Sequence, residues 1–111
     1  MKMYTTQDQT AKLIELGFEK PRTQVTELYE FGETQKIVAR YAYSLGELLE
    51  LLQKGIEAHS GLTHYWLMFE YNEERKYWKV EYAQQFELTI ESELIDAIYK
   101  MCVKLKDKEV I

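Results

Sequence analysis

Two histidines five positions apart are the first residues in this sequence that suggest chemistry. His59 and His64 flank the segment HSGLTH, and imidazole nitrogens are common ligands of zinc. A zinc site needs three or four ligands, and neither a cysteine pair nor an H-E-x-x-H spacing completes the set in this sequence. The pattern therefore predicts a loop histidine and a sheet-face histidine, and we expect no metal or other cofactor.

Ser60 and Cys102 carry the atoms of a nucleophile. Ser60 directly follows His59, but adjacent side chains rarely point toward one another, and no G-x-S-x-G elbow surrounds this serine. Cys102 falls on the apolar stripe of an expected helix, where burial raises the pKa of a thiol and makes it unreactive. A single cysteine excludes an internal disulfide and favours a reducing compartment, so we expect a cytoplasmic protein.

Composition and charge describe one globular domain. Hydrophobic residues make up 46% and charged residues 30% of the 111 positions, which is enough apolar content for a domain of this size to bury a core. The net charge is −5, and residues 41–95 carry ten acidic and four basic groups. Nucleic-acid binding needs a basic surface, and a membrane span needs about 20 apolar residues, so we expect neither nucleic acid nor membrane as a partner. The sequence after Met1 also lacks the apolar core of a signal peptide.

Three segments have the apolar spacing of helices. They are residues 6–16, 45–54 and 91–106. Thr6 with Gln9, and Ser44 with Glu47, have the spacing of capping boxes, in which each side chain bonds the backbone N–H of the other residue. We therefore expect the first two helices to begin immediately after Thr6 and Ser44.

Glycines mark the expected ends of the first two helices. Gly17 stands where a helix ends in the left-handed conformation, and Phe18 is then placed to pack back on Leu13. Gly55 follows the leucine-rich stripe of the second helix and is predicted to end it.

Alternating side chains predict strands near residues 35–43, 63–71 and 76–83, and a further strand near 24–30 is left open. If that further strand forms, Gly32 turns it into the next one as a hairpin. In residues 35–43, Ile37, Ala39 and Tyr41 share one face, whereas Val38 and Arg40 share the other.

The stretch THYWLMFEYNEERKYWKVEYAQ predicts an antiparallel hairpin with its turn around residues 72–75. A loop with an even number of residues, of which four is favoured, keeps the apolar side chains on one face. The expected pairs are Phe69 with Trp78, Leu67 with Val80, and Tyr65 with Tyr82.

These elements predict an α+β fold in a single domain over residues 1–111. We expect one small antiparallel sheet with the three helices packed mainly on one of its faces.

Three stretches, TAKLIELGFEKPR, YAYSLGELLELL and ESELIDAIYKMCVKLK, resemble a group of small uncharacterised bacterial proteins of about this length. These proteins are found in gut Bacteroidetes genomes and in some mobile or phage-derived elements. The resemblance covers most of the chain apart from residues 22–34. It implies a compact α+β domain and an intracellular location, and it implies no activity and no functional residue.

The outer face of the predicted sheet is the surface that most suggests a function. It is rich in aromatic, methionine and arginine side chains with charged neighbours, which is typical of a protein-binding patch. Its candidate residues are Val38, Arg40, Trp66, Met68, Tyr77 and Lys79. The leading hypothesis is a non-enzymatic protein-interaction module, as a homodimer or with another protein partner.

Two alternatives stay open. The first is a small ligand-binding domain or enzyme whose site lies near His64 and Tyr77. The second is an acidic accessory or inhibitor protein of a mobile element, whose carboxylates would imitate the charge of nucleic acid.

Overall fold

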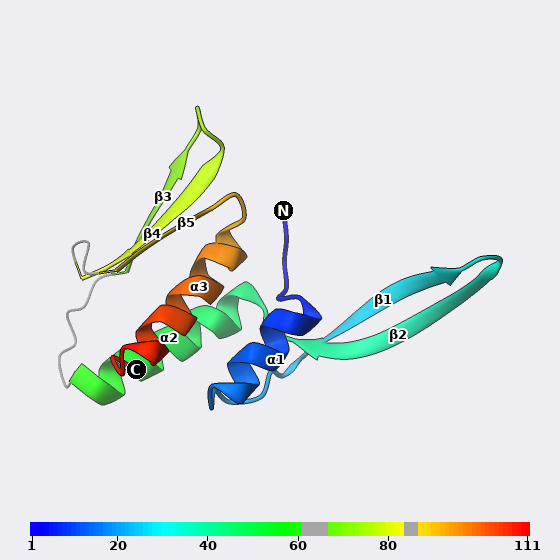
Figure 1. Cartoon of the computed structure of the whole chain (residues 1–111), viewed down its shortest axis with the longest axis horizontal. Coiled ribbons are helices and arrows are strands. Elements are labelled where there is room, and N and C mark those ends of the chain that lie inside the picture. The colour runs from blue at the N-terminus through cyan, green and yellow to red at the C-terminus, as the bar shows by residue number, and fades with distance from the viewer. Residues whose placement is uncertain (61–66, 84–86) are drawn as a thin grey trace.

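The computed structural model describes residues 1–60, 67–83 and 87–111, except for the side chains of His59 and Ser60. The elements follow the order α1 (Gln7–Glu15), β1 (Thr23–Phe31), β2 (Thr34–Ala42), α2 (Leu45–Ser60), β3 (Leu67–Asn72), β4 (Tyr77–Tyr82), β5 (Glu87–Glu91) and α3 (Leu94–Asp107). The chain thus has the predicted α+β fold (Figure 1).

Helix α1 begins and ends as its sequence predicts. The Thr6 hydroxyl accepts a hydrogen bond from the Gln9 backbone N–H, and the Gln9 side chain accepts one from the Thr6 N–H, which completes the capping box. Gly17 has a φ of 96°, and the Phe18 N–H donates to the carbonyl oxygen of Leu13. This is the Schellman ending, and it turns Phe18 back onto the core.

Helix α2 begins at its predicted cap but runs past its predicted end. The Ser44 hydroxyl accepts from the Glu47 N–H at 3.2 Å, as expected for a capping box. The helix continues through Gly55 to Ser60, so the prediction that Gly55 ends it is wrong. A Cβ on Gly55 would lie 2.8 Å from the Cβ of Ile111. The glycine therefore lets the last residue of the chain pack closely against the helix.

Strands β3, β4 and β5 form one antiparallel sheet, and β5 was not predicted from the sequence. The β3–β4 pairs are Leu67 with Tyr82, Phe69 with Val80, and Tyr71 with Trp78. The predicted pairing is therefore wrong by two residues, because the four-residue loop lies at 73–76 and not at 72–75. A shift of two keeps every described side chain on its predicted face, whereas Tyr65 lies outside the described residues.

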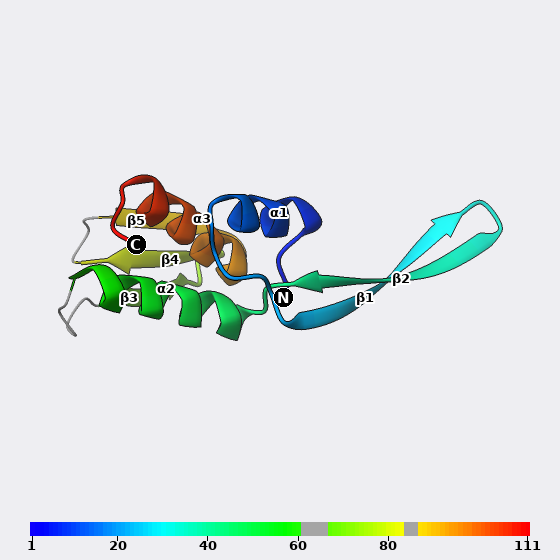
Figure 2. The same ribbon diagram turned by 90° about the horizontal axis from the view of Figure 1, so that it is seen from below.

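Helix α3 covers one face of strands β4 and β5. Helix α3 contacts β4, β5, α2 and α1, so it lies at the centre of the molecule (Figures 1 and 2). Val80 and Tyr82 on β4 and Thr89 on β5 are at most 3% exposed under it, and the Thr89 hydroxyl donates to the carbonyl oxygen of Ala97 at 2.8 Å. The remaining core comes from the apolar stripes of α1, α2 and α3. It includes Leu13, Leu48, Leu52, Ile95, Ile98, Met101 and Leu105.

Strands β1 and β2 form a separate two-stranded sheet, so the expectation of a single sheet needs correction. The hairpin pairs over nine residues on each strand, from Thr23 with Ala42 to Phe31 with Thr34. Gly32 has a φ of 60°, as the first central position of a type II′ turn requires. The turn at Gly32 connects the two strands directly. Neither strand pairs with β3, β4 or β5.

The β1–β2 hairpin projects from the helical body along the longest axis of the molecule (Figures 1 and 2). The molecule measures 54 × 36 × 19 Å, and its radius of gyration is 15.6 Å. A compact domain of this length would have a radius of gyration of about 13 Å. The hairpin is thus an arm, and the rest of the chain is the body that holds it.

Candidate functional site

The two faces of the hairpin differ in how they meet the body. One face, which we call the anchored face, carries Thr23, Val25, Glu27, Tyr29, Phe31, Thr34, Lys36, Val38, Arg40 and Ala42. The other, which we call the free face, carries Gln24, Thr26, Leu28, Glu30, Gln35, Ile37, Ala39 and Tyr41. The anchored face is half-buried near its base, whereas every residue of the free face is exposed.

Arg40 fastens the anchored face to the body. Its Nε donates to a carboxylate oxygen of Glu27 at 2.7 Å, and its Nη2 donates to the carbonyl oxygen of Thr5 at 3.0 Å. The Arg40 hydrogen bond, with a second one from Tyr29, lowers the pKa of Glu27. The Nη1 of Arg40 is buried without a hydrogen-bond partner in the described part of the chain. These contacts give Arg40 a structural position between the hairpin and the N-terminal segment.

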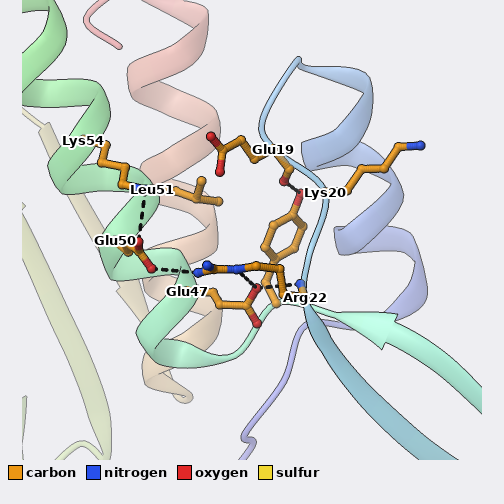
Figure 3. A pocket seen from close by; sticks show the side chains of 8 residues that line it. Glu19, Lys20, Arg22, Glu47, Glu50, Leu51 and Lys54 are labelled. Carbon is orange, nitrogen blue, oxygen red and sulfur yellow. Dashed lines mark hydrogen bonds and ion pairs between the residues drawn. The ribbon is translucent and has the colours of Figure 1, made fainter.

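A second set of contacts holds the start of β1 against α2 (Figure 3). Glu47 accepts from the Arg22 backbone N–H at 2.8 Å and also from the Thr23 hydroxyl. The Arg22 Nη2 donates to Glu50 at 3.0 Å. Burial raises the pKa of Glu47, but hydrogen bonds from Arg22, Thr23 and Ser44 outweigh that effect and lower it overall. Glu47 therefore joins the cap of α2 to the base of the hairpin as an ionised group.

The cavity among these side chains is too small for a ligand. Its volume is about 10 Å³, which is about the space of one water molecule. Tyr43 lines it and donates its hydroxyl to the carbonyl oxygen of Glu19. Burial, followed by the nearby Glu47 charge, raises the pKa of Tyr43 to about 12. The Tyr43 and Glu47 side chains thus join the segment before β1 to the body through hydrogen bonds.

The free face exposes large apolar side chains. Leu28 is 56% exposed, its cross-strand partner Ile37 is 71% exposed, and Tyr41 nearer the base is 59% exposed. Tyr41 also borders a groove of about 450 Å³ between α1 and the hairpin base. Its other lining residues are Thr10, Ile14, Lys20 and Pro21. The groove and the free face of the hairpin meet at Tyr41.

The free face was not predicted as a functional surface, although the sequence carries a signal for it. The alternation in residues 35–43 correctly placed Ile37, Ala39 and Tyr41 on one face, but the outer surface was assigned to the face of Val38 and Arg40. The structure reverses that assignment, because Arg40 turns toward Thr5 in the body. Alternation shows which side chains share a face, but only tertiary packing shows which face is covered.

A second exposed surface lies on the side of the three-stranded sheet that no described helix covers. Lys79 at its centre forms ion pairs with Glu70 at 3.1 Å and Glu81 at 3.0 Å, and these two carboxylates raise the pKa of Lys79. Met68 is 56% exposed and Ile90 is 48% exposed on either side of these charges. The open sheet face therefore carries exposed apolar side chains on either side of a central group of ion pairs.

The six residues predicted as an interaction surface do not meet on one face. Val38 and Arg40 lie on the anchored face of the hairpin, whereas Met68, Tyr77 and Lys79 lie together on the open sheet face. Trp66 lies outside the described residues. Leu88 and Ile90 on β5 belong to the same open face and were not foreseen, because β5 was not predicted.

Catalytic chemistry has little support in the described part of the chain. No group of three or more potential metal ligands occurs there. Burial raises the pKa of the Cys102 thiol to about 12, and the residue is 0% exposed. Tyr77 has its hydroxyl 3.4 Å from the Asn72 amide, whereas His64, its proposed neighbour in a ligand site, lies outside the described residues.

Several acidic side chains in the described part of the chain are paired with cations on different elements. The described pairs include Glu27 with Arg40, Glu50 with Arg22 and Lys54, Glu70 and Glu81 with Lys79, Glu91 with Lys100, and Asp96 with Lys2. An imitation of nucleic acid would need a row of uncompensated carboxylates. The distribution therefore gives no support to that alternative.

Comparison with known proteins adds no family to this description. No protein-family model, curated protein or solved structure matches the chain. A search of the described helices finds none with the length and apolar character needed to cross a membrane.

Proposed function

We propose that this chain is a non-enzymatic protein-interaction module and that the projecting β1–β2 hairpin is its binding element. The observation that carries this proposal is the pair of opposed side chains Leu28 and Ile37, which are 56% and 71% exposed on an arm that extends away from the body.

A free arm of this kind has a physical reason to bind. A two-stranded hairpin is at best marginally stable in water, and it usually needs a third strand or a covering element. The body covers only the base of the anchored face, and both faces are exposed from Tyr29 to Lys36. Large exposed apolar patches on small proteins mark interaction sites. A partner that covers the free face would stabilise the hairpin and bury its apolar side chains together.

The charge of the arm favours a protein partner over nucleic acid. Residues 23–42 contain three acidic and two basic side chains, and Arg40 is already paired with Glu27. Binding to phosphates requires an excess of Lys and Arg.

We also propose a cytoplasmic location, where a reducing environment suits the single buried cysteine.

The open sheet face is the second candidate for the binding surface. Met68, Leu88 and Ile90 are between 37% and 56% exposed on it. At its centre Lys79 is paired with both Glu70 and Glu81, so these three groups keep one net negative charge, which a partner covering this face would have to pair.

Shortening the hairpin tests the proposal. A variant in which residues 28–37 are replaced by an Asn-Gly turn keeps the base of the hairpin and its contacts with α2. We expect its body to stay folded by circular dichroism, and we expect it to lose the associations that the full chain forms with itself or with proteins of its source cell. Met68→Asp on the open sheet face is the matched control and should keep them. Loss of association in Met68→Asp alone would move the binding surface to that face.

A further inference from the structure

We propose that the partner of the free face is a second copy of this chain, bound through the same face about a two-fold axis. This inference rests on the proposed role of the hairpin as the binding element. The two-fold axis lies in the plane of the interface and runs perpendicular to the strands. It passes over the cross-strand pair Thr26 and Ala39. In a two-fold dimer each copy offers the same patch, so the patch must complement itself.

The sizes of the free-face side chains have this self-complementary pattern. The side chains of Thr26 and Ala39 at the axis are small. The larger side chains of Leu28 and Ile37 lie two residues farther toward the tip of the hairpin. Tyr41 stands two residues toward the base on β2, about 7 Å from the axis on the other side. The two-fold axis places Ile37 of one copy over Tyr41 of the other, and the small side chains at the axis let the sheets approach.

The groove beside Tyr41 adds to this fit. It lies at the base of the free face and is bordered by Ile14 and Pro21. Because the copies run in opposite directions, the outer half of one hairpin meets the base of the other. The exposed side chains of Leu28 and Ile37 are thereby brought to the groove of about 450 Å³ in the second copy.

Charge on the free face also favours a second copy. Glu30 is the one charged residue of this face within β1 and β2. It lies four residues outward from Thr26, so the two-fold axis brings it to the position of Arg22 in the other copy. Lys20 lines the groove next to that position and has no ion pair in the described part of the chain. Arg22 is already paired with Glu50, so each copy offers Glu30 of its free face to Lys20 of the other.

The available area is sufficient for a small specific interface. At roughly 200 Å² for a fully exposed large side chain, Leu28, Ile37 and Tyr41 together leave on the order of 400 Å² on each copy. With the polar side chains between them, two copies approach the roughly 1,000 Å² of total buried surface that a biological interface needs. The chain carries a net charge of −5, and the nearly uncharged free face is where two acidic copies can approach with little repulsion.

Light scattering across the micromolar range measures the association directly. The full chain should reach a mass of 26.6 kDa, twice the 13.3 kDa of one copy. Ile37→Asp should weaken dimerisation at least about tenfold, because it places a carboxylate in the apolar contact. Phe31→Asp is the matched control, since Phe31 is 64% exposed on the anchored face, and it should dimerise like the full chain. A monomer at all concentrations, or equal weakening by both variants, overturns the proposal.

Charge reversal tests the direction in which the copies pack. Glu30→Lys and Lys20→Glu should each weaken the dimer, and the double variant should recover most of the loss, because the interacting charges are exchanged between copies. Rescue of this kind requires the two positions to meet across the interface. Independent effects that add in the double variant would contradict the two-fold arrangement.

Cross-linking tests the position of the axis. Ala39→Cys, treated with a short bis-maleimide, should join the two copies, because a residue beside the axis faces its own image. Lys36→Cys on the anchored face should not, and the native Cys102 is 0% exposed and does not compete. The opposite result would rule out this interface.

The outcomes also separate this inference from the proposed function. If the full chain is monomeric but the shortened-hairpin variant loses binding to a different protein, the hairpin is a binding element whose partner is not a second copy. If shortening the hairpin changes no association at all, both proposals fail.

Discussion

At the scale of single residues, Glu47 shows how one carboxylate connects three parts of the chain. It is part of the cap of α2 through Ser44, and it accepts hydrogen bonds from Arg22 and Thr23 at the start of β1. Its side chain is 12% exposed, so water does not replace these bonds when the carboxylate is lost. The sequence predicts the capping role from spacing alone, whereas the contacts with the hairpin exist only in the folded chain.

Glu47→Gln should lower the free energy of unfolding by about 1–2 kcal/mol at neutral pH, because hydrogen bonds to a charged acceptor are stronger than those to an amide. Urea denaturation measures this change. Glu50→Gln is the control, because Glu50 is 44% exposed and water screens its ion pairs, so this change should lower the free energy of unfolding less than Glu47→Gln does.

The effect of Glu47 should depend on pH with a defined sign. The pKa of Glu47 is lowered in the folded chain from its ordinary value of 4.5. Its ionised form therefore stabilises the fold above pH 4.5, and this contribution is lost as the pH falls through the lowered pKa. The difference between the full chain and Glu47→Gln should shrink in urea titrations repeated below pH 4.5. A difference that stays constant into strong acid would show that the charge contributes nothing.

Whether an alanine at Gly55 stabilises or destabilises the fold depends on the neighbouring side chain of Ile111. Gly to Ala inside a helix normally stabilises it by about 1 kcal/mol. Here the new Cβ would lie 2.8 Å from Ile111 Cβ, and displacing the 4% exposed Ile111 costs about 1.5–3 kcal/mol of apolar burial. Gly55→Ala should therefore destabilise the full chain but stabilise an Ile111→Gly variant. Thermal or urea unfolding of the four proteins measures both signs, and stabilisation in both backgrounds would contradict the close packing.

At the scale of elements, the hairpin combines a firm base with a weakly supported outer half. Its base is held by Arg40 and Glu47, whereas both faces are exposed from Tyr29 to Lys36. Local stability in proteins follows burial and contact density. The element is therefore the one whose dynamics should respond most to a partner.

Amide hydrogen exchange should follow this gradient along the hairpin. In the Ile37→Asp variant, amides near the turn at Gly32 should exchange much faster than those near Ala42, which is 0% exposed at the base. In the full chain at high concentration, the outer amides should become protected as the copies cover one another. Uniform exchange along the hairpin at low concentration would show that the arm is supported in some other way.

At the scale of the whole molecule, the projecting arm determines the overall dimensions. The radius of gyration of 15.6 Å exceeds the value of about 13 Å for a compact domain of this length. The body alone cannot account for the 54 Å long axis, because the hairpin extends along it (Figure 2).

Small-angle scattering checks this arrangement in solution. The Ile37→Asp variant should have a radius of gyration close to 15.6 Å, and the shortened-hairpin variant should move toward about 13 Å. The full chain at high concentration should give a maximum dimension above the 54 Å of one copy, since overlapping hairpins place the two bodies at opposite ends. A radius that is equal in both variants would mean that the hairpin folds back on the body.

The amino-acid sequence alone determined the local features of this protein. The capping boxes at Thr6 and Ser44, the Schellman ending at Gly17, and the separation of apolar and polar faces on β2 follow from bonds and side-chain spacings within a few residues. Such features depend on backbone geometry that neighbouring residues already define.

The way in which these elements combine depends on tertiary packing. Whether β2 joins β4, whether Gly55 ends a helix or admits Ile111, and which face of the hairpin is covered all depend on contacts between residues far apart in the chain. A hydrophobic pattern marks side chains that favour burial, but the free energy of burial is realised only where another element arrives. No element of the described chain packs against Ile37 and Leu28, so the free face of the hairpin is exposed.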